Sequence, residues 1–332
     1  MTRGYRTGRL WPTLLGALGV ALWASETTLI TYTTAIPPLQ MVTVAFGCAA
    51  LTSPFVWWMT GTSPLAAFRQ PARVWLLTVG SLAGYHACIY FATQQAPPAA
   101  AALLQGTTPL MIVLGSALLP GERLRWWHMV GTSLGLCGAL LLIENGSQTA
   151  AAISDAAFHL SLIGVAAGLW GLYSVASRSL PDVPSAALGV FYAACAVVLA
   201  CAHLLLETWV APSREEWAAM TALGVVPMGL AIYLWDYGVK RGDIQALGAF
   251  SYVEPFIGAV LVALFTNGVL GWNLLWSGVL VLGGAALSAV SLWSGPPEPE
   301  VADMDRSARL QRVSVGCVHK AQTNAQGWSP PW

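Results

Sequence analysis

The stretch AALLQGTTP at residues 101–109 decides the fold, because its closing Pro109 returns 146 positions later as Pro255, at the end of the stretch LGAFSYVEP (247–255). Repetition at a fixed shift indicates a chain built from two copies of one unit. Tryptophan, which like proline is rare inside helices, also aligns: Trp126 with Trp272 at this shift and Trp23 with Trp170 at a shift of 147, and Gly138 falls on Gly284.

The composition of the chain is typical of an integral membrane protein. Charged residues make up 9% of it and hydrophobic residues 56%, whereas a soluble globular protein carries about 25% charged residues. The apolar runs reach the roughly 20 residues that a helix needs to cross a bilayer, and they are too continuous for the alternating strands of a membrane barrel. We therefore predict an all-α membrane protein with ten transmembrane helices. They are expected near residues 10–32, 37–60, 73–94, 98–119, 126–143, 158–178, 185–207, 217–240, 244–266 and 272–293.

The ten predicted helices form two inverted five-helix repeats. Because each half has an odd number of spans, the second half enters the membrane from the opposite side. Of the 15 Lys and Arg residues, this topology leaves only Arg214 on the external side, and such a bias marks the other side, which holds both termini, as cytoplasmic. The predicted segments are a cytoplasmic N-terminus (1–9), a first repeat (10–143), an external linker (144–157), a second repeat (158–293) and a disordered cytoplasmic tail (294–332).

Glu254 is the sharpest candidate for a functional residue. It lies near the middle of the ninth predicted span, where an ionisable side chain is costly and by default functional. The next residue, Pro255, cannot donate a backbone hydrogen bond and is expected to free the carbonyl of Ser251 one turn earlier. Under the 146-residue shift Thr108 matches Glu254 and Gln105 matches Ser251, which completes a ring of polar groups on the fourth and ninth helices. The alternative is that Glu254 is a buried structural acceptor that ties its helix to its neighbours.

Aromatic residues of three predicted spans form the second set of candidates. Tyr85, His86 and Tyr90 lie close together on the third span, and polar-tipped aromatic side chains can bind a planar ligand while they hydrogen-bond its polar end. Trp23 and Trp170 lie in the opening helices of the two halves, so the pseudosymmetry would place them opposite one another. Each set has a structural alternative, since a lone helical histidine is often a packing residue and tryptophan is favoured at membrane interfaces.

The remaining charged residues have simpler explanations. Glu26 follows Trp23 by one turn and approaches the external end, where a wet vestibule or an interfacial carboxylate explains it as well as a binding site does. Asp236 precedes Lys240 by four residues, so an ion pair at the cytoplasmic end is expected there. No Lys or Arg falls in the interior of a predicted span, which argues against a phosphorylated substrate, because its carrier would need fixed cations. The cysteine and histidine spacing predicts no metal site.

Several short motifs resemble the EamA-type drug/metabolite transporters. They are AALLQGTTP at 101–109, YVEP at 252–255, Trp23 and Trp170 in the opening helices, and Glu122 at the foot of the fourth helix. Within that superfamily the stretch 232–255 is similar to the YddG-like branch of aromatic amino-acid exporters, through Trp235, Tyr237, Gly238, Gly242, Ser251 and Tyr252. The resemblance covers about residues 10–293. It implies efflux of amino acids and similar metabolites across the bacterial inner membrane, through a central cavity that opens alternately to each side. The chain departs from the pattern at Gly268, where the second half has no counterpart of Glu122.

The sequence therefore predicts a secondary transporter, not an enzyme, that exports aromatic and other neutral amino acids. The predicted substrate-binding residues are Trp23, Tyr85, His86, Tyr90, Gln105, Thr108, Trp170, Ser251, Tyr252 and Glu254. We expect the aromatic rings to surround the side chain of a small-molecule substrate and the polar groups to hold its other end. No cofactor and no nucleic-acid partner is expected, membrane lipid surrounds the chain, and the monomer is expected to be functional.

Two alternatives to this prediction remain. The first is a proton-coupled exporter of drugs or lipophilic cations, in which Glu254 or Glu26 alternates between proton and cation. The second is a membrane-embedded enzyme that acts on lipid. An enzyme would need a compact nucleophile and base or a set of metal ligands, and the scattered acids around His86 offer neither.

Overall fold

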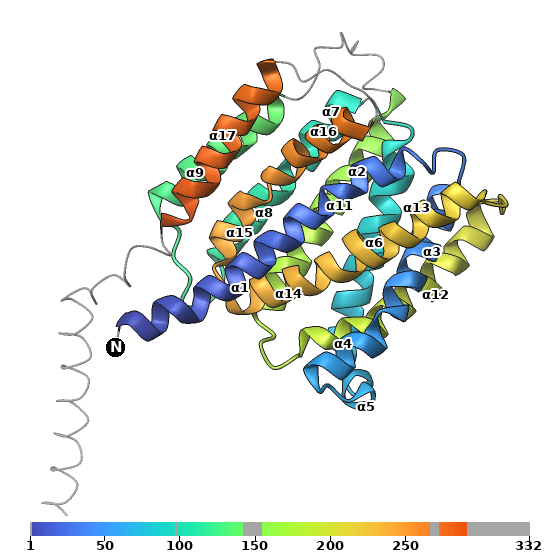
Figure 1. Ribbon diagram of the computed structural model, residues 1–332, viewed down its shortest axis with the longest axis horizontal. Coiled ribbons are helices and arrows are strands. Elements are labelled where there is room, and N and C mark those ends of the chain that lie inside the picture. Colours follow the sequence, from blue (N-terminus) through green and yellow to red (C-terminus); the bar gives the residue numbers. More distant parts are fainter. Residues whose placement is uncertain (1, 97, 142–154, 266–271, 291–332) are drawn as a thin grey trace, which may run out of the picture. The chain divides into compact units, whose positions relative to one another are not determined.

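The computed structural model describes residues 2–96, 98–141, 155–265 and 272–290, and every regular element within these ranges is a helix (Figure 1). The described residues from Arg3 onward belong to one compact unit. The predicted tail at 294–332, most of the predicted linker at 144–157 and Gly268 lie outside the described residues.

Each predicted span lies on one helix or on two or three helices in succession. The first half of the chain contains α1 (Thr2–Trp23), α2 (Ser25–Ile30), α3 (Pro38–Leu51), α4 (Ser53–Thr60), α5 (Pro64–Phe68), α6 (Ala72–Thr93), α7 (Pro98–Gln105), α8 (Thr107–Ser116) and α9 (Trp126–Leu140). The second half contains α11 (Ala157–Arg178), η1 (Ser185–Ala187), α12 (Leu188–Leu206), α13 (Arg214–Val225), η2 (Val226–Ala231), α14 (Ile232–Arg241), α15 (Ile244–Phe250), α16 (Val253–Phe265) and α17 (Trp272–Ser288).

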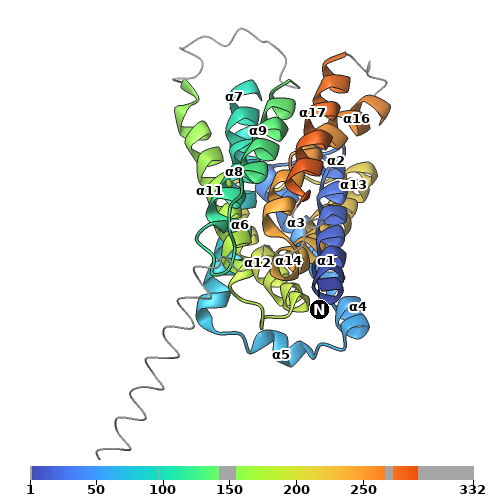
Figure 2. The same ribbon diagram turned by 90° about the vertical axis from the view of Figure 1, so that its left-hand side faces the viewer.

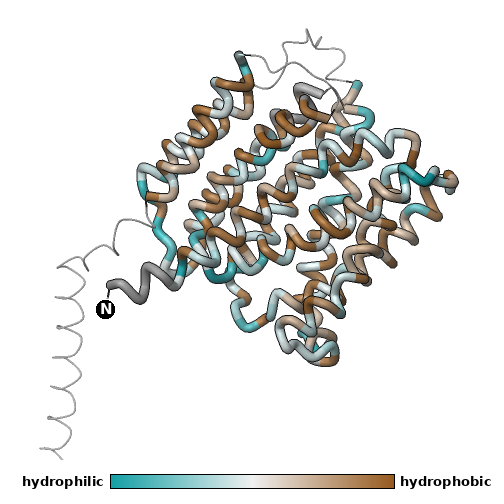
Figure 3. Tube along the Cα trace, viewed as in Figure 1, coloured by the Kyte–Doolittle hydropathy of each residue, from teal (hydrophilic) through white to brown (hydrophobic). Residues whose placement is uncertain are grey.

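Seven helical segments of the described chain are long and apolar enough to cross a membrane. They are Gly8–Ile30, Pro38–Thr60, Ala72–Thr93, Ala157–Arg178, Ser185–Leu206, Arg214–Arg241 and Ile244–Leu261. The other three predicted spans carry shorter helices: α7 with α8, α9, and α17. Figure 3 shows apolar residues along the lengths of the helices and hydrophilic residues mainly near their ends. The chain is therefore a multi-pass helical membrane protein.

Two of the predicted spans are broken at equivalent positions of the repeat. The helix ends after Gln105 and restarts at Thr107, and it ends again at Phe250 and restarts at Val253. Proline explains both breaks, because its ring clashes with the carbonyl four residues earlier but fits the first turn of a new helix. Pro109 and Pro255 each occupy such a first turn. The predicted free carbonyl of Ser251 is wrong, because that oxygen accepts the N–H of Glu254 at 3.2 Å.

The last helices of the two halves, α9 and α17, pack against each other over glycine (Figures 1 and 2). A β-carbon on Gly131 would lie 2.4 Å from the carbonyl oxygen of Gly284, and one on Gly138 would lie 2.9 Å from that of Ser277. Under the 146-residue shift the first pair maps onto the second. The two helices therefore run antiparallel and use equivalent positions for contact. Small residues of this kind let membrane helices approach closely.

Candidate aromatic and acidic binding site

An aromatic cluster centres on Trp170, in the middle of α11, which is 5% exposed. Its ring centroid lies 4.8 Å from that of Trp23 in an edge contact, 5.1 Å from that of Tyr85 and 5.4 Å from that of Tyr173. Trp235 of α14 adds a further ring, 5.5 Å from Trp23. Trp23 and Trp170, which the repeat aligned in the sequence, are thus in direct contact. Rings from α1, α6, α11 and α14 together present aromatic edges and faces of the kind that bind planar groups.

Glu26 joins this cluster through Tyr90. A turn at Ala24 separates α1 from α2, and Glu26 lies in the first turn of α2. Its carboxylate accepts a hydrogen bond from the Tyr90 hydroxyl of α6. Sequence reasoning left Glu26 between an interfacial position and a site, and Tyr90 fixes it beside the aromatic residues.

Glu254 approaches the same place from α16. Gly258, one turn further along that helix, lies against α2, since a β-carbon there would be 3.1 Å from Thr27 Oγ1 and 3.5 Å from the Ala24 carbonyl oxygen. This packing brings Glu254 near enough to Glu26 for their charges to interact, and both carboxyl groups interact with Tyr85. Within the described ranges, the Glu254 side chain makes no hydrogen bond or ion pair.

Gln105 completes the group at the end of α7. Its side chain is exposed and lies near enough to that of Tyr85 to interact with it. Gln105 is the last residue of α7 and directly precedes the helix break at Gly106. Among the predicted residues of the first half, Tyr90 and Tyr85 therefore interact with Glu26.

His86 is a member of the aromatic cluster and also bonds to the backbone of its own helix. It is buried, its ring centroid lies 4.8 Å from that of Tyr85 and 6.5 Å from that of Trp170, and its Nδ1 donates to the Leu82 carbonyl at 2.7 Å, one turn back. The Ser251 hydroxyl likewise donates to the Leu247 carbonyl at 3.0 Å. The hydroxyl of Thr108 is buried with no hydrogen-bond partner among the described residues.

Tyr252 lies in a separate contact between the repeats. Its ring packs against Gly135, where a β-carbon would come within 2.6 Å of it, and its hydroxyl donates to the Gly106 carbonyl at 2.9 Å. Gly106 is the residue that the 146-residue shift aligns with Tyr252, so this bond joins equivalent breaks of the two halves. Tyr252 is 1% exposed and belongs to a small apolar cluster with Val281 and Ala285.

Trp235 and Tyr173 are members of the aromatic cluster that were not among the predicted site residues. Trp235 is fully buried, and its indole N–H donates to the Ser174 hydroxyl at 3.1 Å. The Tyr173 hydroxyl donates to Asp236 at 2.9 Å. The expected ion pair is also present, with Lys240 Nζ at 2.7 Å from Asp236. The aromatic cluster is thus linked by one tyrosine to charged groups at one end of the bundle.

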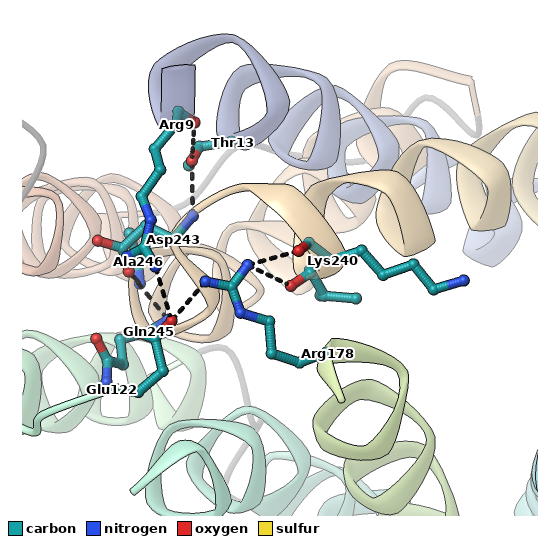
Figure 4. Close-up of polar contacts among 9 residues, drawn as sticks. Arg9, Thr13, Glu122, Arg178, Lys240, Asp243, Gln245 and Ala246 are labelled. Atoms are coloured by element: carbon teal, nitrogen blue, oxygen red, sulfur yellow. Dashed lines mark hydrogen bonds and ion pairs between the residues drawn. The ribbon is translucent and has the colours of Figure 1, made fainter. Parts of the chain in front are cut away.

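A network of charged residues surrounds Glu122 at this end of the bundle, as Figure 4 shows. Arg9 of α1 lies 3.0 Å from its carboxylate, and Arg178 at the end of α11 binds the same oxygen. Arg178 also donates to the carbonyl of Lys240 at 2.7 Å. Asp243 caps α15 by accepting from the backbone N–H of Gln245 and Ala246, and its own N–H donates to Thr13. The network ties α1, α11, α14 and α15 to the segment between α8 and α9.

Replacing Glu122 by glutamine is expected to lower the midpoint of thermal unfolding in detergent. The Glu122 side chain is 6% exposed and that of Arg178 is 12% exposed, and removal of one partner of a buried ion pair costs about 3 kcal/mol. Arg123→Gln is the matched control, because Arg123 is an exposed charge in the same segment. Equal midpoints for the two variants would contradict a stabilising role for Glu122.

The chain matches the model of the EamA-like transporter family over residues 10–144 and 158–290. It is 35% identical to the aromatic amino acid exporter YddG of Ancylobacter novellus, over 84% of this chain and 96% of that protein. It is 23% identical to a probable terminal-alkyne amino-acid exporter of Streptantibioticus cattleyicolor, over 81% of this chain and 93% of that relative. One solved crystal structure, 34% identical in sequence, aligns with a TM-score of 0.80 and covers 85% of this chain and 97% of its own.

Proposed function

Because this chain belongs to the EamA-like transporter family, we propose that it is a secondary transporter that exports amino acids, aromatic and other neutral ones, and related metabolites. It is a transporter and not an enzyme. The observation that carries the substrate class is the contact of Trp23, Trp170 and Tyr85 beside the polar side chain of Gln105. Such a group can enclose an aromatic side chain and hydrogen-bond its polar end.

The proposal includes ten membrane spans in two inverted repeats, with residues 10–143 and 158–293 as the halves. Three observations support this arrangement: the family model matches the chain in two segments, α9 and α17 meet antiparallel at equivalent glycines, and Tyr252 bonds to its repeat equivalent Gly106. The charge bias of the sequence favours cytoplasmic termini in a bacterial inner membrane. In this orientation the Glu122 network lies on the cytoplasmic side.

The proposed transport cycle is a rocking of the two repeats about a fixed binding site. Trp23, Tyr85 and Trp170 form the aromatic walls, and Gln105 and Glu254 lie at the breaks that follow α7 and α15. The Glu122 network is the barrier on the cytoplasmic side, and its ion pairs separate when the site opens there. His86, Thr108, Ser251 and Tyr252 support the site from the same helices, and Tyr90 positions Glu26.

The direct test is transport by the purified protein in liposomes. We expect concentration-driven flux of labelled phenylalanine, tryptophan or another neutral amino acid, and no flux in protein-free liposomes. Flux of a quaternary cation without flux of any amino acid would contradict the proposed substrate class.

The paired carboxyl groups of Glu26 and Glu254 support a second candidate, a proton-coupled exporter of lipophilic cations. The two functions differ in the expected behaviour of Glu254→Gln. In a proton-coupled exporter this variant abolishes uptake driven by an imposed pH gradient, because the exchangeable proton is removed. In a facilitator the variant retains downhill exchange of amino acids. Glu215→Gln, an exposed acid on α13, is the control and should retain both activities.

A further inference from the structure

Two carboxyl groups that come from different helices meet beside the aromatic cluster. Glu26 lies on α2, where one of its oxygens accepts from Tyr90. Glu254 lies on α16, and the packing of Gly258 against Ala24 and Thr27 holds that helix to α2. Both carboxyl groups interact with Tyr85, whose ring is 5.1 Å from that of Trp170. The acids and the rings therefore belong to one site.

The acids have no cationic partner in the part of the chain that the structure describes. Arg9 and Arg178 pair with Glu122, and Lys240 pairs with Asp236. Among the described residues, Glu26 accepts a hydrogen bond only from the neutral Tyr90, and the Glu254 side chain makes no hydrogen bond or ion pair. An uncompensated carboxylate within a membrane is costly. A ligand that brings a positive charge removes that cost.

The two ends of a zwitterionic amino acid would be treated unequally here. Its ammonium group would find two carboxyl acceptors and aromatic faces, which attract cations. Its carboxylate would find only neutral donors, such as the Tyr85 hydroxyl and the Gln105 amide, and would be repelled by Glu26 and Glu254. The site is therefore built to bind the amino group more strongly than the carboxylate.

We infer that Glu26 and Glu254 form a subsite for a protonated primary amine, and that amines with an aromatic group and no free carboxylate are ligands of this protein. Arylalkylamines and amino-acid amides are the chemical class. The inference rests on the proposed aromatic site and adds to it the two carboxyl groups that determine which ligands are preferred. Compounds with the ring and the carboxylate but no free amine are poor ligands.

Competition against labelled phenylalanine, with the purified full-length protein in liposomes, tests this selectivity. We expect phenylalaninamide and phenethylamine to compete at least as well as unlabelled phenylalanine. N-acetylphenylalanine and 3-phenylpropionate should compete at least tenfold more weakly. Equal competition by N-acetylphenylalanine would overturn the inference.

Glutamine variants assign the selectivity to the two acids. Glu26→Gln and Glu254→Gln should each weaken binding of phenethylamine about tenfold, while the affinity for 3-phenylpropionate is unchanged or increased. If the acids had a purely structural role, each variant would weaken the binding of both ligands alike, and that result would overturn the inference. Glu254→Asp keeps the charge and should restore the preference for the amine. Glu215→Gln controls for the loss of an acid elsewhere.

Direct binding to the detergent-solubilised protein separates this inference from the proposed function. If phenethylamine binds in a manner that depends on Glu254 while no amino acid is transported, the amine subsite holds and the proposed amino-acid export fails. If phenylalanine is transported but neither glutamine variant changes the ratio of amine to acid affinity, the export stands and the amine subsite fails.

Discussion

Gly284→Val is expected to abolish recovery of folded, monodisperse protein. A β-carbon at Gly284 would lie 2.4 Å from the carbonyl oxygen of Gly131 and 3.0 Å from the backbone nitrogen of Gly135. Both are backbone atoms that no side-chain rotation can move, so α9 and α17 would have to separate. Close packing is a main source of helix association in membranes, and overpacking by a single side chain costs about 1–3 kcal/mol even where neighbours can adjust. Size-exclusion profiles and the midpoint of thermal unfolding measure the effect.

The neighbouring glycine provides a matched control. Gly283 lies on the same helix, is exposed, and has no heavy atom within 4 Å of the position that a β-carbon would take. Gly283→Val should therefore change stability by less than about 0.5 kcal/mol. Because Gly138 is the repeat equivalent of Gly284 and lies against Ser277 in the same manner, Gly138→Val should fail as Gly284→Val does. Normal folding of Gly284→Val would show that α9 and α17 do not need this contact.

The helical architecture could be predicted from the sequence because hydropathy and length are properties of a single segment. The bilayer requires continuous apolar helices, and every predicted span carries helix in the structure. Pro255 likewise predicted a disturbed ninth span, but the expected free carbonyl of Ser251 accepts the N–H of Glu254, and the equivalent break before Pro109 was not predicted. The contact between the short helices α9 and α17 could not be predicted from hydropathy, because it depends on which glycine of one helix faces the backbone of the other.

The site was harder to predict because it depends on contacts between helices. The repeat placed Trp23 against Trp170, since symmetry carries information about distant pairs. Trp235 has no aromatic partner in the alignment, and Glu26 is aligned with Tyr173 but is placed by its bond to Tyr90, so only the tertiary packing brings these two residues to the cluster. Tyr252 illustrates the opposite error, because it lies in the break between α15 and α16, where the helical spacing of the span no longer fixes the direction of a side chain. Its neighbour Glu254 reaches α2, whereas Tyr252 packs against Gly135.

Trp170→Ala is expected to lower kcat/KM for phenylalanine transport about a hundredfold. Trp170 is the ring that both Trp23 and Tyr85 contact, and loss of a buried tryptophan side chain removes about 3 kcal/mol or more of packing. Truncation of a buried tryptophan at the centre of a binding contact costs about 2–4 kcal/mol of binding, and since 1.4 kcal/mol corresponds to a factor of ten, a change of this size is expected for an aromatic substrate. Trp276→Ala on α17, where the side chain is 58% exposed, should leave transport unchanged.

Selectivity distinguishes binding by Trp170 from a role in packing alone. If the ring contacts the substrate, Trp170→Ala lowers the affinity for phenylalanine far more than that for alanine, because alanine has no side-chain ring to lose the contact. Trp170→Phe keeps an aromatic face between Trp23 and Tyr85 and should recover most of the preference for phenylalanine. Both variants are compared as folded protein of equal monodispersity. A Trp170→Ala variant that loses transport of both amino acids to the same extent would make Trp170 a residue of the helix interface, and the aromatic wall of the site would then have to be formed by Trp23 and Tyr85.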